Sequence, residues 1–398
     1  MDRRGFLLGG ACSLAASPLI TPVALAAAPW DRRLVVIILR GAMDGLDALR
    51  PLGDPDFAAL RRDMAPDALG LDGYWALHPS FAPLEPLWQA GEFGAVHAVS
   101  TPYRDKRSHF DGQDILEAGL PDLTRGGLRD GWLNRVLQLQ TGLEAEIAFA
   151  VGREDLLVLS GDAPISRWSP EAKLRLSPQA RLLLDRVYHD DPLFQQTSFE
   201  AMQIVESLAE AEAMAEQTEE MMGADPMMAQ ARGRGEHRQL AEFAATRLRG
   251  DTRIASFSLG GWDTHVRQQN TFARAADDLA DTILTLRAGL GEVWAQTAVV
   301  CVTEFGRTAA QNGNLGTDHG TGGAMLFFGG ALRGGRVVAD WPGLAEADLY
   351  DRRDLMPTRD VRAHLAWIIA GITGLPRAGL ERAVFPGLQM GEDPGLLA

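Results

Sequence analysis

The chain has 398 residues, of which 46% are hydrophobic and 23% charged, and its formal net charge is −15 at pH 7. These proportions are typical of a globular protein that folds around a hydrophobic core. The acidic balance repels phosphate backbones and therefore argues against binding to nucleic acid. Two cysteines, Cys12 and Cys301, are too few for a disulfide framework or a thiolate metal cluster.

Residues 1–26, MDRRGFLLGGACSLAASPLITPVALA, have the pattern of an export signal. The paired Arg3 and Arg4 precede an apolar run that ends in Ala-Leu-Ala, which predicts twin-arginine export and cleavage after about residue 26. A membrane anchor is the alternative, but two prolines interrupt a run that is already shorter than the roughly 20 residues of a span. We therefore expect a periplasmic or secreted protein with no stable membrane anchor, and the twin-arginine export machinery as a partner.

Apolar runs alternate with longer helical patterns along the chain, which is typical of an α/β fold with a largely parallel sheet covered by helices. RLVVIILRG (33–41) is nearly continuous in apolar residues, as expected of a strand that is buried on both faces. Further strands are expected at 93–100, 146–152, 253–260, 297–304 and 324–330. Helices are expected at about 80–90, 109–118, 128–140, 233–249, 270–289 and 359–372.

The segment at about 195–232 differs from its surroundings because it is rich in Glu, Ala and Met. A site for a soft metal is one interpretation of its methionines. We favour a helical insertion whose methionines lie on its buried face. Because no internal repeat interrupts the pattern, residues 27–398 are expected to form a single domain that includes this insertion.

Polar side chains gather in four segments that follow predicted strands or lie between them. The segments RGAMDGLD, GGWDTH, TEFGRT and GTDHG contain Asp44, Asp47, Asp263, His265, Glu304, Arg307, Asp318 and His319. Ligands of open α/β sheets bind at the carboxyl ends of strands, so these groups are candidates for one shared site. Imidazole and carboxylate together suit zinc, whereas carboxylates alone suit harder cations. Taken singly, each segment has a plainer interpretation as a helix cap or a turn.

Eight segments occur in a fixed order along the chain: LRGAMDGLDALRP, LHPSFAPL, RSHFDGQDILEAG, GWLNR, GGWDTH, TEFGRTAAQNG, GTDHGTGG and VFPG. Together they resemble an uncharacterised, twin-arginine-exported, sulfatase-like family (domain of unknown function 1501) that is placed in the alkaline phosphatase superfamily. The resemblance extends from about Leu34 to Gly387. It implies an alkaline-phosphatase-like sheet sandwiched by helices, and a metal-dependent hydrolase site.

The resemblance also implies metal ligands at particular positions. It implies that Asp44 binds one metal ion and that Asp263 and His265 bind another. The superfamily has an Asp-His pair after the next strand. This chain has Glu304 followed by Phe305 there, so one carboxylate is kept and one imidazole is missing.

His319 matches the last histidine of the superfamily pattern, in a loop whose glycines allow a close approach. The resemblance makes Asp318 either a further ligand or the carboxylate that orients His319. Arg307 has a guanidinium that matches the geometry of phosphate or sulfate, and it can equally pair with Glu304.

The nucleophile that the resemblance implies lies at the start of a helix, which here matches Ser108. His109 beside it is a candidate ligand or proton carrier. The alternative is that Ser108 is a helix cap, because Ser108 and Asp111 form a pattern like a capping box. The sequence STPYR (100–104) matches the core of the formylglycine signature of sulfatases, but its second half is absent, so formylglycine chemistry is not expected.

Two functions follow from these observations. The first is an exported hydrolase that uses one or two divalent ions (zinc, manganese or calcium) to cleave a small or glycan-linked phosphate or sulfate ester. The second is a non-catalytic exported binding or assembly protein on the same fold, which Phe305 favours because a ligand is expected there. We favour the hydrolase, because several ionisable groups gathered in one cleft without a ligand would be costly.

Overall fold

The computed structural model describes residues 30–64, 68–104, 106–122, 130–140, 143, 147–170 and 235–398. The expected export signal at 1–26 and the expected Met-rich insertion at about 195–232 lie outside these ranges. No helix among the described residues combines the length and the hydropathy that a membrane span requires.

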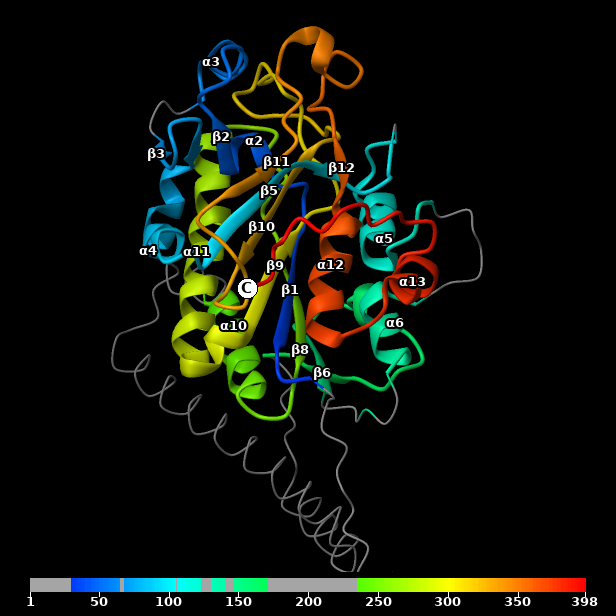
Figure 1. Ribbon diagram of the computed structural model, residues 1–398. Coiled ribbons are helices and arrows are strands. Elements are labelled where there is room, and N and C mark those ends of the chain that lie inside the picture. Colours follow the sequence, from blue (N-terminus) through cyan, green and yellow to red (C-terminus); the bar gives the residue numbers. More distant parts are fainter. Residues whose placement is uncertain are drawn as a thin grey trace, which may run out of the picture.

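A nine-stranded sheet forms the centre of the described structure (Figure 1). Its strand order is β11-β5-β10-β9-β1-β8-β6-β7, and β12 also pairs with β5. The strands are β1 (Arg33–Leu39), β5 (Phe93–Ser100), β6 (Ala148–Val151), β7 (Ser166–Trp168), β8 (Ile254–Leu259), β9 (Thr297–Val302), β10 (Gly323–Phe328), β11 (Val337–Ala339) and β12 (Arg359–Asp360). Neighbouring strands are parallel except at β10, which runs antiparallel to β5 and β9. The predicted α/β class with a largely parallel sheet is confirmed.

Helices cover both faces of this sheet, as Figure 1 shows. One face packs against η2 (Pro79–Leu84), α4 (Glu85–Gln89), α10 (Glu236–Leu248) and α11 (Gln268–Leu290). The other face packs against α5 (His109–Ala118), α6 (Trp132–Gln138) and α12 (Val361–Thr373). A small second sheet is formed by β2 (Leu49–Pro51), β3 (Leu69–Gly70) and β4 (Trp75–Leu77). The remaining short elements are α2 (Gly45–Ala48), α3 (Phe57–Leu60), η4 (Leu157–Leu159), η5 (Gly291–Gln296), η6 (Glu346–Asp348), α13 (Arg377–Gly379) and η7 (Leu380–Val384).

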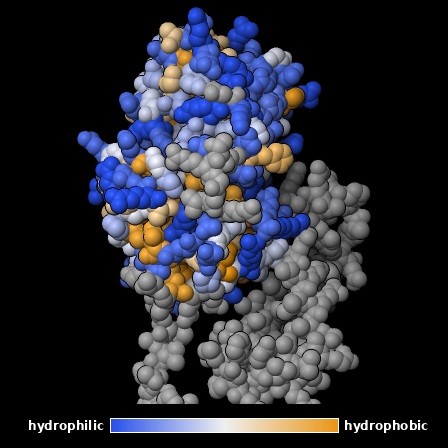
Figure 2. Space-filling view, turned by 90° about the vertical axis from the view of Figure 1, so that its right-hand side faces the viewer, coloured by the Kyte–Doolittle hydropathy of each residue, from blue (hydrophilic) through white to orange (hydrophobic). Residues whose placement is uncertain are grey.

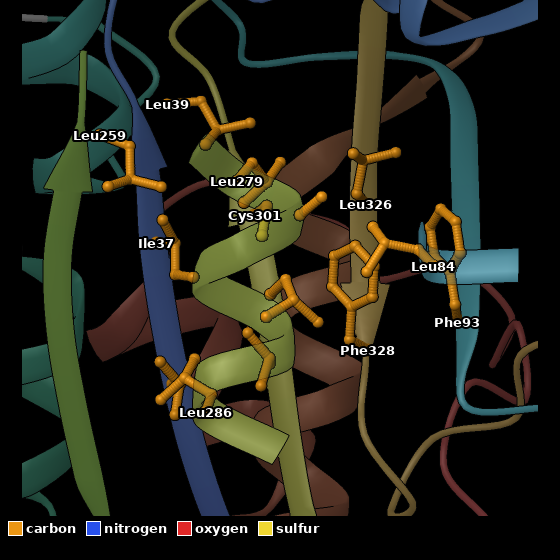
Figure 3. Packing of buried hydrophobic residues seen from close by; sticks show 14 of the residues in the cluster. Ile37, Leu39, Leu84, Phe93, Leu259, Leu279, Leu286, Cys301, Leu326 and Phe328 are labelled. Atoms are coloured by element: carbon orange, nitrogen blue, oxygen red, sulfur yellow. The ribbon is translucent and has the colours of Figure 1, made fainter. Parts of the chain in front are cut away.

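The central strand β1 explains why the sheet is covered on both sides. Successive side chains of a strand point to opposite faces, and almost all of β1 is apolar. Ile37 and Leu39 lie in the hydrophobic cluster on the α11 side, where Figure 3 shows them near Leu279 and Leu286. Val36 and its same-face neighbours lie in the opposite cluster. Both layers of helices are therefore fastened to the same strand.

Helix α5 shows how local sequence sets the position of a site residue. Ser108 is its N-cap and accepts a hydrogen bond from the backbone N–H of Asp111. Gly119 ends the helix in the left-handed conformation, with φ of 64°. These two caps make His109 the first helical residue, at the end of the connection from β5.

The direction of the strands brings the predicted site segments to one end of the sheet. β1, β8, β9 and β5 all end there, and β10 begins there because it is antiparallel. This is the upper end of the sheet in Figure 1.

Candidate functional site

Three histidines and one aspartate meet at this end of the sheet. His109 opens α5, Asp263 and His265 follow β8, and His319 precedes β10. The ring centroids of His109 and His319 are 4.3 Å apart, and those of His265 and His319 are 4.7 Å apart. We call His109, Asp263, His265 and His319 the histidine cluster.

Each imidazole of the cluster is anchored through its Nδ1 atom. His109 Nδ1 lies 2.8 Å from Glu304 Oε1, and His265 Nδ1 lies 3.1 Å from Asp318 Oδ1. His319 Nδ1 lies 2.9 Å from the backbone carbonyl oxygen of Arg107. Carbonyl and carboxylate oxygens accept hydrogen bonds, so each Nδ1 carries the proton. In the neutral imidazole, the lone pair is then on Nε2.

The Nε2 atoms converge on Asp263. His265 Nε2 and His319 Nε2 lie 3.0 and 3.1 Å from Asp263 Oδ1, and only 2.9 Å from each other. His109 Nε2 is buried, makes no hydrogen bond within the described part of the chain, and lies 3.5 Å from Asp263 Oδ2. Bare lone pairs at these separations repel each other and the carboxylate. A shared cation removes that repulsion, and anchored Nδ1 atoms are the usual arrangement around metal-binding histidines.

The pKa shifts in the cluster agree with a carboxylate among imidazoles. Burial by itself raises the pKa of Asp263, but the charge of Arg307 outweighs it and holds the pKa below its usual value. Burial lowers the pKa of His319, which keeps its Nε2 free of a proton at neutral pH. The hydrogen bond that His109 donates to Glu304 raises the pKa of His109.

Arg307 lies beside the cluster with most of its donors free. Its Nη1 donates to Asp263 Oδ1 at 3.0 Å. Its Nε and Nη2 atoms are buried and have no partner among the described residues. A buried guanidinium with unused N–H groups loses free energy unless something accepts them. This side chain is therefore positioned for an anion next to Asp263.

The glycines around His319 allow two loops to lie in direct contact. A Cβ atom at Gly320 would lie 2.3 Å from the backbone carbon of Arg307, and one at Gly316 would lie 2.3 Å from the backbone of His265. Gly320 N–H donates to the Gly306 carbonyl at 2.8 Å, and Thr308 N–H donates to the Asp318 carbonyl at 2.9 Å. Because Gly316 and Gly320 have no side chain, the backbone on either side of His319 lies directly against the loops that contain His265 and Arg307.

A family model described as a protein of unknown function (DUF1501) matches residues 89–366, which is more than half of the chain and includes the whole histidine cluster. The chain belongs to the DUF1501 family. No curated protein matches this DUF1501 chain in sequence.

Several solved structures resemble it weakly. A protein of the alkaline phosphatase superfamily from Vibrio parahaemolyticus is 12% identical over 86% of this chain and 72% of its own, with a TM-score of 0.37. A mutant TAB5 alkaline phosphatase with bound magnesium is 9% identical over 88% of this chain and 100% of its own, with a TM-score of 0.37. A lipoteichoic acid synthase from Listeria monocytogenes is 8% identical over 79% and 72%, with a TM-score of 0.36. With TM-scores this low, these structures indicate nothing about the chemistry of the DUF1501 chain.

Asp44, expected as a metal ligand, lies in a separate buried network. Its carboxylate accepts two hydrogen bonds from Arg61, at 2.6 and 3.1 Å, and one from Gln268 at 2.6 Å. It also caps α2 by accepting from the N–H of Leu46. Burial alone would raise the pKa of Asp44, but the charge of Arg61 outweighs it and lowers the pKa. Because these partners occupy both oxygens, we leave Asp44 out of the ligand set; Asp47 likewise pairs with Arg50, at 2.8 Å.

Glu304 and Asp318 also hold histidines instead of facing the cluster. Glu304 Oε1 accepts from His109 Nδ1, from the N–H of Gly41 at 2.9 Å and from Gln113 at 3.2 Å. Asp318 was expected either to bind metal or to orient His319, but its Oδ1 lies against His265. The expectation that it orients His319 is therefore wrong in this structure, because the Arg107 carbonyl takes that position.

Ser108 and Phe305 flank His109. Ser108 is a helix cap, as one of the two interpretations predicted, and its role as a nucleophile stays a prediction. Phe305 occupies the position where an imidazole was expected. Its ring stacks on His109 with centroids 5.2 Å apart and contacts His319 at the same distance. Phe305 thus forms an apolar wall of the cluster.

Three residues that were not singled out in the sequence hold His319 in place. Arg107, at φ of 52°, presents its carbonyl to His319. The fully buried Asp354 accepts hydrogen bonds from Arg107 at 3.2 Å and from Thr321 and Arg353 at 2.9 Å. Arg353 also donates to the carbonyl of His319, at 3.0 Å. No motif marks Asp354, because its partners come from three separate segments.

Proposed function

We propose that this protein is an exported hydrolase of phosphate or sulfate esters that depends on a divalent metal ion. The observation that carries the proposal is the convergence of three Nδ1-anchored imidazoles on one carboxylate. The ligand atoms of His109, Asp263 and His319 lie within 4.8 Å of one another, and His265 Nε2 touches two of them. This donor set fits a single ion.

The chemistry of the donors favours zinc. Imidazole nitrogen with one carboxylate is a typical zinc set, and each histidine has the outer hydrogen bond that fixes its tautomer. A bound divalent ion would polarise the ester oxygen and neutralise developing negative charge. Manganese remains compatible with the same nitrogen and oxygen donors. The set is a poor one for calcium, which prefers oxygen ligands only.

The chain's own residues supply anion binding, orientation of a metal ligand and a candidate nucleophile. The free Nε and Nη2 atoms of Arg307 bind two oxygens of the phosphate or sulfate group. Glu304 accepts the Nδ1 hydrogen of His109 and so orients His109 Nε2 towards the ion. Ser108, at the N-terminus of α5, is the candidate nucleophile, because the helix end favours an anion beside it.

Export is part of the same proposal and rests on residues 1–26. Twin-arginine transport carries proteins that have already folded, which suits a chain that binds a metal ion before it leaves the cytoplasm. Replacing Arg3 and Arg4 by lysines should leave the protein in the cytoplasm, as immunoblots of the cell fractions would show. Normal export of that variant would contradict this part.

Variants of the histidine cluster test the enzymatic part. His319→Ala and Asp263→Ala should remove the metal and hydrolysis of a panel of phosphate and sulfate esters, while the melting temperature of the metal-free protein changes little. His237→Ala is the matched control, because His237 is also a buried histidine paired with a carboxylate, Asp281, at 2.7 Å, but outside the cluster.

The other candidate function is a non-catalytic exported binding or assembly protein. Phe305 favours it, because an apolar ring takes the place of an expected ligand. It predicts that the cluster variants lower thermal stability and that the wild type hydrolyses no ester, with or without zinc, manganese or calcium. Turnover by the wild type that the Asp263→Ala change abolishes would eliminate it.

A further inference from the structure

A cavity borders the histidine cluster on the side of Asp318. Its volume is about 560 Å³, within the range of about 300–1,000 Å³ that is usual for small-molecule sites. Three segments line it: α3 with the residue before it, residues 308–318 and residues 344–353. Figure 1 shows α3 and the orange loop around 346–353 at the upper end of the molecule, where the strands that carry the site also end. We call this cavity the side pocket.

Two residues that line the side pocket are in direct contact with the histidine cluster. Asp318 Oδ1 lies 3.1 Å from His265 Nδ1, and His265 Nε2 in turn lies 3.0 Å from Asp263 Oδ1. One imidazole ring therefore separates the pocket wall from the carboxylate of the cluster. Arg353 also lines the pocket, and its Nη1 donates to the backbone carbonyl of His319 at 3.0 Å. A group at the cluster and a group in the pocket are thus close enough to belong to one small molecule.

The side chains between the cluster and the side pocket are open to solvent. The exposed fraction of the side chain is 47% for Asp263, 38% for His265 and 50% for Asp318. These three side chains contact one another in that order. Together they form a continuous exposed path, along which a ligand held at the cluster can extend to the pocket.

The charges that line the side pocket nearly cancel. Three acidic and two basic side chains line it: Asp56, Asp318, Glu346, Arg352 and Arg353. Arg352 and Glu346 neutralise each other in an ion pair at 2.8 Å. A lining of this kind gives no strong preference for a cation or for an anion. The group that it suits is polar and uncharged.

Hydrogen-bonding groups of both kinds are available in the side pocket. The carboxylate of Asp56 caps no helix, and within the described residues Asp318 uses only its Oδ1 as an acceptor. Arg353 uses only its Nη1 as a donor to these residues. A carboxylate requires a donor and a guanidinium requires an acceptor, and a hydroxyl group can be either. A molecule with several hydroxyl groups therefore matches the pocket.

The side pocket is poorly suited to an aromatic or a long alkyl group. Among the described residues, no aromatic side chain lines it, and its apolar contacts come from aliphatic side chains such as Leu60 and Leu349. A patch of this size suits the C–H face of a sugar ring. Figure 2 shows hydrophilic residues over most of the upper part of the described surface on the face that it draws. A ligand at this end of the molecule thus meets mainly polar groups.

We propose that the side pocket binds a sugar as the alcohol part of the ester, so that the substrates are sugar phosphates or sugar sulfates and not aryl or alkyl esters. The inference rests on the proposed function and specifies its substrate class. Arg307 and the histidine cluster bind the anionic group. Hydroxyl groups of the sugar donate to Asp56 and Asp318 and accept from Arg353, which an aryl or alkyl group cannot do.

The test fills the side pocket from the surface and compares the result with a matched control. Ala59 is an exposed residue of α3 that lines the pocket, so Ala59→Trp fills it. Ala58→Trp is the control, because Ala58 is the exposed neighbour of Ala59 on the same helix and does not line the pocket. Asp56→Ala, which removes a carboxylate without removing a helix cap, should act in the same direction as Ala59→Trp.

The measured quantity is the ratio of KM for a sugar ester to KM for a phenyl ester. We expect Ala59→Trp to raise this ratio by about tenfold for glucose 6-phosphate and galactose 6-phosphate against phenyl phosphate, and Ala58→Trp to leave it unchanged. Comparing each variant with the wild type cancels the different reactivities of the esters. Glucose 6-sulfate against phenyl sulfate gives the same comparison for sulfate esters.

Binding of free sugars tests the side pocket without turnover and without the metal ion. Saturation-transfer NMR of the metal-free chain should show binding of glucose or galactose to the wild type and to Ala58→Trp, and none to Ala59→Trp. An unchanged KM ratio in Ala59→Trp, an equal change in Ala58→Trp, or no saturation transfer to either sugar would overturn the inference. Sugar binding that Ala59→Trp abolishes, with no turnover of any ester, would instead contradict the hydrolase and leave the side pocket as a sugar site.

Discussion

Asp318 offers a conservative way to test whether the histidines are arranged around a metal ion. Its Oδ1 accepts hydrogen bonds from His265 Nδ1 and from Asn312, both at 3.1 Å. Burial alone would raise the pKa of Asp318, but these hydrogen bonds outweigh it and lower the pKa, so the side chain is a carboxylate at neutral pH. Asp318→Asn keeps the size and an oxygen acceptor, and it removes the charge.

The magnitude follows from the kind of hydrogen bond that is weakened. A hydrogen bond to a charged group contributes about 1.5–3 kcal/mol and a neutral one about 0.5–1.5 kcal/mol, so the loss is about 1 kcal/mol. The Asp318 side chain is half exposed, and solvent screening keeps the loss near the lower limit. Since about 1.4 kcal/mol corresponds to tenfold, a loss of about 1 kcal/mol lowers the affinity for zinc by about fivefold.

Calorimetric titration with zinc at low ionic strength measures this change. Asp155→Asn is the control, because it removes one carboxylate that pairs with Arg167 in an exposed ion pair outside the cluster. The melting temperature of the metal-free protein should be similar in both variants. An affinity of Asp318→Asn within twofold of the wild type, or an equal loss in the control, would refute the idea that Asp318 positions His265 for a metal ion.

Three further predictions concern stability and the nucleophile. Ser108→Ala should lower the free energy of unfolding by about 1 kcal/mol through loss of the cap, and it should lower kcat by more than a hundredfold only if Ser108 is the nucleophile; ester kinetics beside denaturant unfolding separate the two effects. His364 is buried with neither ring nitrogen bonded within the described residues, so His364→Leu should raise the free energy of unfolding by about 1 kcal/mol, and a lower value in urea titration would contradict this. Burial lowers the pKa of His97 to about 4 against an ordinary 6.5. As the pH falls, His97 is therefore protonated in the unfolded chain at a higher pH than in the folded chain. Stability from His97 is complete above pH 6.5 and should decline by about 3 kcal/mol towards pH 4; a pH profile of unfolding that His97→Gln leaves unchanged would contradict this.

The regular elements could be predicted from local sequence because their signals are local. The apolar run at 33–41 became β1, and the span 109–118 became α5 because Ser108 and Gly119 cap it. The direction of β10 could not be predicted in this way, because an apolar run reads the same in either orientation. The strands of the small sheet are two or three residues long, too short for an alternating pattern to be visible.

The membership of the site was predictable only in part, for a physical reason. The acids and histidines near strand ends were candidate site residues because the carboxyl ends of parallel strands lie at one edge of a sheet. His265 and His319 do lie in contact there. Whether a carboxylate faces the cluster or a neighbouring cation depends on partners far away in sequence. Arg61, which holds Asp44, directly follows α3 and is not marked by any pattern in the chain.

The most direct test of the account is the metal content of the purified chain, measured by elemental analysis beside that of His319→Ala. We predict close to one divalent ion per wild-type molecule and almost none in the variant, while His237→Ala retains the ion. A wild-type protein that contains no divalent ion and takes up neither zinc nor manganese in titration would contradict the account.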